Sequence, residues 1–136
     1  MIIDLYTCCF NEADILPFVI DYWKNTVDHV TVYDNYSTDN SISILKKHDW
    51  IDVIEYDSNN LLNDYMLLEI KNNAWKKSKG NADFTIVCDL DECVYSYDLK
   101  HILEIFKASN VIGITPMMYN LISKDFPKYK YHALMH

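Results

Sequence analysis

The stretch Phe84-Thr85-Ile86-Val87-Cys88-Asp89-Leu90-Asp91-Glu92 decides the fold, because it places three carboxylates directly after a short apolar run. Such a run is typical of a buried strand, and we expect one over residues 84–89. In open α/β sheets the carboxyl ends of the strands form the ligand-binding edge. Asp89 and Asp91 point the same way from an extended backbone and can grip one hard cation. A solvated turn or a helix cap is the structural alternative.

Outward from this stretch, β-type runs alternate with segments of helical periodicity. The alternation predicts an α/β fold, namely a three-layer α/β/α sandwich with a mostly parallel sheet. In the longest expected helix Tyr65, Leu68 and Trp75 share one apolar side with Asn72 among them, and most aromatic residues are expected in the core. The expected strands are residues 2–10, 29–34, 51–56, 84–89 and 111–116; the expected helices begin after Asn11–Asp14, run through Ile42 and Leu45, span about 62–78 with Gly80 as the C-cap, and include 99–106.

Composition narrows the classes of ligand. At 136 residues, half of them hydrophobic, the chain has the size of a single folded domain. Its net charge of -8 argues against a nucleic-acid-binding surface, which needs Lys and Arg to neutralise phosphates. An acidic protein that binds an anionic ligand needs a cation or backbone N–H groups, so the composition favours a metal.

Cysteine spacing and the N-terminus indicate the compartment. Cys8, Cys9, Cys88 and Cys93 have neither a zinc-site spacing nor the density of a disulfide scaffold. We expect reduced thiols that pack as small hydrophobes, in a reducing, cytoplasmic compartment. The N-terminus lacks the basic region of a signal peptide, and no apolar stretch approaches the roughly 18 residues of a transmembrane helix.

Polar side chains follow three of the expected strands, and in a parallel sheet these strand ends share one edge. The sequence therefore predicts that they converge, although a helix cap or a turn could explain each one alone. Lys71 is either a solvated helix residue or a cationic contact to a diphosphate. His132 and His136 have a spacing that suits two metal ligands, but a structural role is favoured. The converging residues are Asn11, Glu12, Asp34, Asn35, Asp89, Asp91 and Glu92.

With these strand ends placed, the chain resembles the family 2-type glycosyltransferases of the GT-A fold. The resemblance covers most of residues 1 to about 120, so that a donor-binding part at 1–120 and a short tail at 121–136 are expected within one domain. The order of the motifs is specific, whereas Asp-x-Asp alone is not. The matching segments are Cys9-Phe10-Asn11-Glu12, Val32–Ser41, Lys71-Asn72-Asn73-Ala74-Trp75 with Gly80, and Ala82–Glu92.

The resemblance implies transfer of a sugar from a nucleotide donor, typically a UDP-sugar, with inversion and with Mn²⁺ or Mg²⁺ as cofactor. By position, Asp34 would accept a hydrogen bond from the base. Asp91 would bind the metal that bridges the diphosphate, together with Asp89, which would face the ribose or sugar, and Glu92 would support them. Phe10 or Tyr36 could stack on the base or sugar. The resemblance also assigns donor binding to Cys9, Phe10, Asn11, Glu12, Asn35, Lys71 and Leu90.

Several alternatives stay open. Members of this family normally continue past the fifth strand into a region that supplies the acceptor site and a general base, whereas this tail offers only Asp125, His132 and His136. The chain is thus a minimal transferase, a truncated one, or a donor-binding module that a partner subunit completes. A haloacid dehalogenase-type phosphatase is disfavoured because its Asp-x-Asp motif normally follows the first strand. A sugar nucleotidyltransferase is disfavoured because it needs a Gly-rich loop and the chain has 2 glycines.

Overall fold

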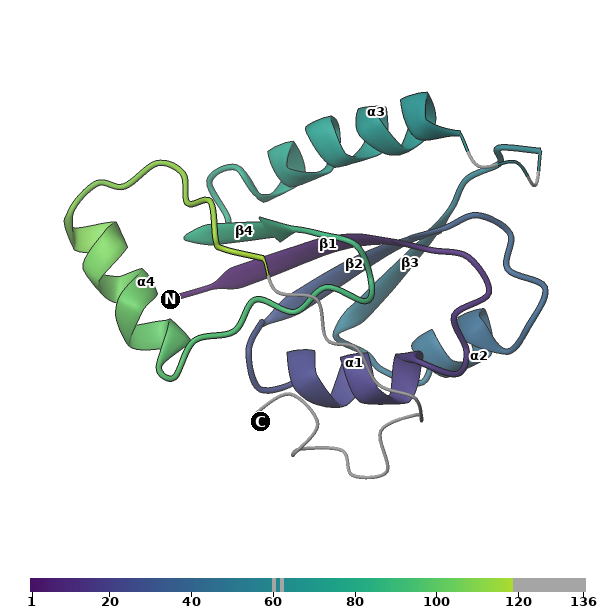
Figure 1. The fold of residues 1–136 in the computed structure, drawn as a ribbon, viewed down its shortest axis with the longest axis horizontal. Coiled ribbons are helices and arrows are strands. Elements are labelled where there is room, and N and C mark those ends of the chain that lie inside the picture. Colours follow the sequence, from purple (N-terminus) through teal and green to yellow (C-terminus); the bar gives the residue numbers. More distant parts are fainter. Residues whose placement is uncertain (60, 62, 119–136) are drawn as a thin grey trace. The chain divides into compact units, whose positions relative to one another are not determined.

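A four-stranded sheet lies at the centre of the computed structural model, which describes residues 1–59, 61 and 63–118. The strand order is β3-β2-β1-β4, and each neighbouring pair is parallel (Figure 1). The predicted α/β class with a parallel sheet is therefore confirmed. The strands are β1 (Ile3–Cys9), β2 (His29–Asp34), β3 (Ile51–Glu55) and β4 (Phe84–Val87), each within a few residues of its expected range.

Helices cover both faces of this sheet. Figure 1 shows α1 (Leu16–Trp23) and α2 (Ser41–Leu45) on one side and α3 (Asp64–Ala74) on the other. Side chains alternate between these faces along β1, so Tyr6 packs with Ala74 while Leu5 lies among residues of α1. Both faces of β1 are consequently covered, which explains why five of its seven residues are buried. Residues 1–93 thus have the layers of an α/β/α sandwich.

The start of α1 differs from the expectation, because an expected capping residue bonds to a neighbouring loop instead. Leu16, Val19, Ile20 and Trp23 form its buried stripe, as expected, and Pro17 lies in its first turn. The expected cap at Asn11–Asp14 is wrong, because the helix begins after Ile15 without a side-chain cap. The side chain of Asn11 instead binds the loop that follows β2.

The apolar side predicted for α3 faces away from the sheet. Tyr65, Leu68 and Trp75 are 87%, 57% and 45% exposed, so the expectation that they belong to the core is wrong. Ile70 and Ala74 pack on the sheet instead. The small side chain of Ala74 lets the helix approach the rings of Tyr6 and Tyr33. Asn72 is exposed and has no need of a buried partner. A 3₁₀ turn, Trp75–Ser78, continues the helix, and Gly80 follows with φ 85°, as its predicted capping role requires.

A buried polar network fixes that turn to β1. The Ser78 hydroxyl donates to the Asp4 carboxylate, and the Tyr6 hydroxyl therefore donates to Ser78 Oγ over 2.8 Å. Ser78 is buried, so each of these polar groups depends on the others for satisfaction. The network holds the end of α3 against the N-terminal half of the central strand.

The chain divides into two units, Met1–Cys93 and Val94–His136. The described part of the second contains α4 (Leu99–Ala108), whose N-cap Asp98 accepts the backbone N–H of His101 over 3.1 Å. Residues 111–118 form no strand, so the strand expected over 111–116 is wrong, and Ile112 is fully exposed there. Asp125, His132, His136 and the rest of the tail lie outside the described residues. Within those described, no helix has the length and apolar character to cross a membrane.

Replacing Ser78 with Ala should destabilise the chain by about 1–3 kcal/mol, because the Tyr6 hydroxyl and the Asp4 carboxylate lose a buried partner. Chemical denaturation followed by circular dichroism measures the loss. Ser109→Ala, at an exposed serine, is the matched control and should change stability by less than about 0.5 kcal/mol. Equal stabilities for the two variants would contradict a stabilising role for this network.

Candidate functional site

Three loops leave the sheet at the same edge. They follow β1, β2 and β4, and because these strands are parallel their carboxyl ends coincide. From β1 the chain adds β2 and then β3 on one side of the sheet, whereas β4 pairs with the other side of β1. The direction in which strands are added therefore reverses at β1. Such a reversal is where open α/β sheets bind ligands. We call residues 10–15, 34–41 and 88–93 the carboxyl-end site.

The β1 and β2 loops of this site are joined by hydrogen bonds. Asn11 Oδ1 accepts the backbone N–H groups of Thr38 and Asp39, at 2.7 and 3.3 Å. In return, the Asn11 N–H donates to Ser37 Oγ over 2.9 Å and the Glu12 N–H donates to Ser41 Oγ over 2.9 Å. Asn11 has φ 56°, a left-handed conformation that asparagine tolerates. These bonds make the two loops one rigid wall.

Asp34 supports this wall from inside. Its side chain is 0% exposed, Oδ2 accepts the Ser37 N–H over 2.8 Å, and Oδ1 accepts the Ser37 hydroxyl over 2.6 Å. The turn that it forms holds Tyr36 at φ 49°, which is strained for a bulky side chain. Tyr36 and, on the β1 loop, Phe10 are both exposed. The loops therefore present two aromatic rings while Asp34 is enclosed.

Asn35 and Cys9 are also buried. Asn35 Nδ2 donates to Ser58 Oγ over 2.7 Å, and its Oδ1 accepts the Ser58 N–H over 3.1 Å. This pair ties the β2 loop to the chain that follows β3. Cys9 is enclosed at the end of β1, next to Asp34 and the loop serines. Both residues support the site, and neither offers its side chain to a ligand in this conformation.

Leu90 anchors the β4 loop. It is 5% exposed and lies with Leu5, Leu16 and Trp23 in the apolar layer beneath α1. Asp89 and Asp91, on either side of it, are exposed. Burial of the central leucine thus turns both acids of the Asp-Leu-Asp segment toward solvent at the sheet edge.

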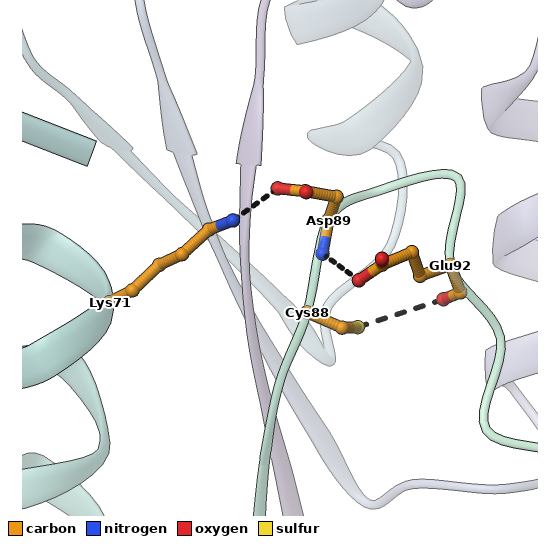
Figure 2. A network of polar contacts seen from close by, with 4 residues as sticks. All are labelled: Lys71, Cys88, Asp89 and Glu92. Atoms are coloured by element: carbon orange, nitrogen blue, oxygen red, sulfur yellow. Dashed lines mark hydrogen bonds and ion pairs between the residues drawn. The ribbon is translucent and has the colours of Figure 1, made fainter. Parts of the chain in front are cut away.

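Asp89 is paired with the one basic residue predicted for the site. Figure 2 shows Lys71 reaching from α3 to the Asp89 carboxylate, with which it forms an ion pair. On the other side the Asp89 N–H donates to Glu92 Oε2 over 2.9 Å, and the Cys88 thiol donates to the Glu92 carbonyl oxygen over 3.6 Å. Partial burial opposes the charge of Lys71, but the hydrogen bond and charge of Asp89 raise the pKa of the ammonium group. Lys71 is therefore a fixed cation, and Glu92 shapes the turn.

Glu12 brings the β1 and β4 loops into one electrostatic environment. Desolvation raises the pKa of its carboxyl group, and the charges of Asp91 and Asp39 raise it further. Negative charge at this point exceeds what the neighbouring side chains neutralise, because Lys71 is committed to Asp89. The negative charge that is not neutralised lies on Glu12 and Asp91.

Burial weakens the four cysteine thiols as nucleophiles. Burial raises the pKa of Cys8 and Cys93 to about 11 and that of Cys9 and Cys88 to about 12. A thiol with such a pKa carries almost no thiolate at neutral pH. All four are free, in agreement with the expectation of reduced cysteines that fill space.

The residues at this edge suit a divalent cation that is shared with a ligand. Among the residues that the structure describes, no group of three His, Cys, Asp or Glu side chains is placed to hold an ion alone. Mg²⁺ seldom needs such a group, since one or two carboxylates, water and substrate phosphates usually complete its octahedron. Asp91 with Glu12 could supply carboxylates of that kind; desolvation is the main cause of the raised pKa of Glu12, and the charge of Asp91, which a cation would offset, adds to it.

Sequence reasoning missed the residues that hold the site together. Ser37, Ser41 and Ser58 bond to the predicted site residues or to their backbone, and Ser41 is completely buried. The polar segment 35–40 is rich in residues that form turns and cap helices, and this composition predicts a turn. It did not indicate that the hydroxyl groups would bond to another loop, because that depends on how β1 and β2 are paired.

A scan against protein-family models gives no match for this chain, and neither does a search of curated proteins.

Shortening Leu90 to Ala should destabilise the chain by about 2–4 kcal/mol, because a cavity would form beneath α1. Chemical denaturation measures this loss. The exposed Met117 is the control position, where Met117→Ala should change stability by less than about 0.5 kcal/mol. A loss at Leu90 no larger than that of the control would mean that this leucine does not anchor the loop.

Replacing Glu12 with Gln should raise the melting temperature at pH 7 by about 1–2 °C, a small gain because the side chain is exposed. The folded chain holds the Glu12 proton to higher pH than the unfolded chain does, so the charged carboxylate costs stability at neutral pH. That cost vanishes below the ordinary pKa of 4.5, where both states are protonated, so no gain is expected at pH 4. Glu104→Gln on α4 is the control. A gain that persists at pH 4 would contradict the electrostatic cause.

Proposed function

We propose that this chain is a nucleotide-sugar-dependent glycosyltransferase with a GT-A-type core, which uses Mn²⁺ or Mg²⁺ and a UDP-sugar. The observation that carries the proposal is the position of Asp89-Leu90-Asp91: an exposed carboxylate pair on a buried anchor, beside β1 at the reversal of strand order. Two exposed aromatic rings, Phe10 and Tyr36, lie on the adjoining loops. Carboxylates for a cation and aromatic faces for a base are the two elements that a nucleoside diphosphate requires.

Asp91 is the residue we assign to the metal, with Glu12 as its neighbour. A divalent cation bound there would neutralise the charge that develops on the diphosphate leaving group as the anomeric bond breaks. Asp89 has a different electrostatic position, since Lys71 already compensates its charge. We therefore assign Asp89 to the ribose or sugar hydroxyl groups and Lys71 to holding Asp89 at the edge of the diphosphate site. Glu92 stabilises this arrangement through the Asp89 N–H.

The role that we propose for Asp34 differs from the direct contact with the base that the resemblance implies. In the described conformation its carboxylate is enclosed and accepts two hydrogen bonds from Ser37, so the base cannot reach it. We propose that Asp34 acts by holding the strained turn that presents Tyr36, and that stacking on Phe10 or Tyr36 supplies most of the affinity for the base. Asn11 has the same kind of role, because its side chain joins the two loops.

Asp91→Asn should reduce Mn²⁺-dependent UDP binding by at least about tenfold, because a neutral amide is a poor ligand for a hard cation. Isothermal titration calorimetry with and without Mn²⁺ measures the effect. Asp52→Asn, at an exposed position within β3 and away from the carboxyl-end site, is the matched control and should bind UDP as the unmodified chain does. Equal affinities for the Asp91 and Asp52 variants would refute the metal assignment.

Transfer and donor binding are separable by one further measurement on the same protein. Release of UDP from a UDP-sugar, in the presence of Mn²⁺ and simple sugar acceptors, supports the transferase. Tight Mn²⁺-dependent binding without release favours a donor-binding module that another subunit completes. Absence of both binding and release would overturn the proposed function as a whole.

A further inference from the structure

Two of the four thiols flank the acidic turn of the carboxyl-end site. Cys88 directly precedes the segment Asp89-Leu90-Asp91-Glu92, and Cys93 directly follows it. The Glu92 N–H donates to the Asp89 carbonyl oxygen over 3.0 Å, which closes residues 89–92 into a turn. Because the chain reverses direction in such a turn, the residues on its two sides are brought toward each other. Cys88 and Cys93 therefore lie at the base of the turn, one on each arm.

The Cys88 side chain reaches across the base of this turn. Its thiol donates to the Glu92 carbonyl oxygen over 3.6 Å, and that carbonyl belongs to the peptide bond that joins Glu92 to Cys93. Figure 2 shows the Cys88 sulfur directed from one arm of the turn toward the other. Burial raises the pKa of Cys88, and the charges of Glu92 and then Cys93 raise it further, so Cys93 lies within electrostatic reach of Cys88. The two thiols consequently share one partly buried environment.

The other two cysteines are not placed to compete for Cys88. Cys8 packs on the α3 side of the sheet with Tyr6 and Val87. The Cys88 N–H continues the ladder by donating to the Tyr6 carbonyl oxygen over 3.3 Å, so the Cys88 side chain lies on the opposite face from that of Val87. Cys9 lies next to the serines of the β2 loop. Cys93 is therefore the thiol best placed to react with Cys88.

We propose that Cys88 and Cys93 form a reversible disulfide bond across the base of the 89–92 turn, so that the carboxyl-end site has a reduced and an oxidised state. The oxidant is a small disulfide such as oxidised glutathione. One protein thiol, as its thiolate, attacks a sulfur of this reagent, forms a mixed disulfide and releases one glutathione thiol. The second protein thiol then displaces the other glutathione. The protein sulfurs thereby lose two electrons to the reagent, and their two protons end on the two glutathione thiols.

The bond would form slowly and would alter the turn. Burial keeps both thiols protonated at neutral pH, and the thiolate is the species that attacks, so the exchange is slow. The Sγ–Sγ bond would replace the contact between the Cys88 thiol and the Glu92 carbonyl oxygen and would draw the two arms together. Glu92 also accepts the Asp89 N–H at Oε2, so a shift of Glu92 moves the acids of the turn. Oxidation is therefore expected to change the site although no carboxylate reacts.

Mass mapping of the full chain after incubation with oxidised glutathione tests whether the bond forms. Trypsin cleaves after Lys79 and Lys100, so one peptide, residues 80–100, carries Cys88 and Cys93 and no other cysteine. We expect this peptide to become lighter by two hydrogens and to resist alkylation, and we expect dithiothreitol to reverse both changes. A peptide that keeps free thiols or ends as glutathione adducts, or a disulfide that joins Cys88 to Cys8 or Cys9, would overturn the proposal.

Single serine variants provide the matched controls for this mapping. Cys8→Ser should leave the oxidation of the 80–100 peptide unchanged, because Cys8 lies on the other face of the sheet. Cys93→Ser should leave Cys88 as a free thiol or a glutathione adduct. Circular dichroism checks that both variants keep their helices. Equal loss of the disulfide in the two variants would contradict the assigned pairing.

The effect of the bond on ligand binding rests on the proposed function and is measured separately. After removal of glutathione, the oxidised chain should bind UDP in the presence of Mn²⁺ at least about tenfold more weakly than the reduced chain, because residues that orient a metal ligand have moved. Isothermal titration calorimetry compares the two states. Equal affinities would overturn control of the site by the thiol pair. If neither state binds UDP, the proposed function fails, and the peptide mapping still decides whether the bond forms.

Discussion

The parallel pairing of β1 with both β2 and β4 is the constraint on which the rest of the structure depends. It places the carboxyl ends of three strands at one edge and reverses the strand order beside β1. It also buries both faces of β1, so that α1 must cover one face and α3 the other. The loops could not meet if any of these strands ran the other way. Residues that are 70 or more positions apart, such as Glu12 and Asp91, thereby share one electrostatic environment.

The acidic side chains at that edge differ in how far their negative charge is neutralised. Lys71 is set on α3 so that it neutralises Asp89, whereas Asp91 and Asp39 both repel the charge of Glu12. The fold tolerates the repulsion because water screens exposed carboxylates, and because buried residues, Asp34 and Leu90, fix the loops independently of the surface charge. The unrelieved charge costs a small amount of stability at neutral pH, and it is the feature on which the proposed cation site rests.

The sequence predicts the fold well because strand and helix periodicity is local, and β1, β2 and β4 appear close to their expected ranges. It fails where an outcome depends on a neighbour. The apolar side of α3 was expected in the core, but Ala74 and Ser78 fit against Tyr6 and Asp4, and periodicity cannot tell a stripe that packs inward from one that faces outward. The roles within the site fail for a related reason. Asp34 and Leu90 sit at the predicted edge, but packing and hydrogen bonds make them supports with enclosed side chains.

One helix thus serves two surfaces, and this gives α3 its unusual composition. Its inner side must be small and polar enough to place Ser78 on Asp4 and to extend Lys71 toward Asp89. On the face that covers the sheet, Ile70 and Ala74 pack against the tyrosine rings, while Tyr65, Leu68 and Trp75 remain on the outer face, where burial within residues 1–93 cannot account for them. Large exposed aromatic and aliphatic side chains lower solubility unless something covers them. α3 and the turn that continues it therefore link the buried network at Asp4 to the carboxyl-end site, because the same segment carries Ser78 and Lys71.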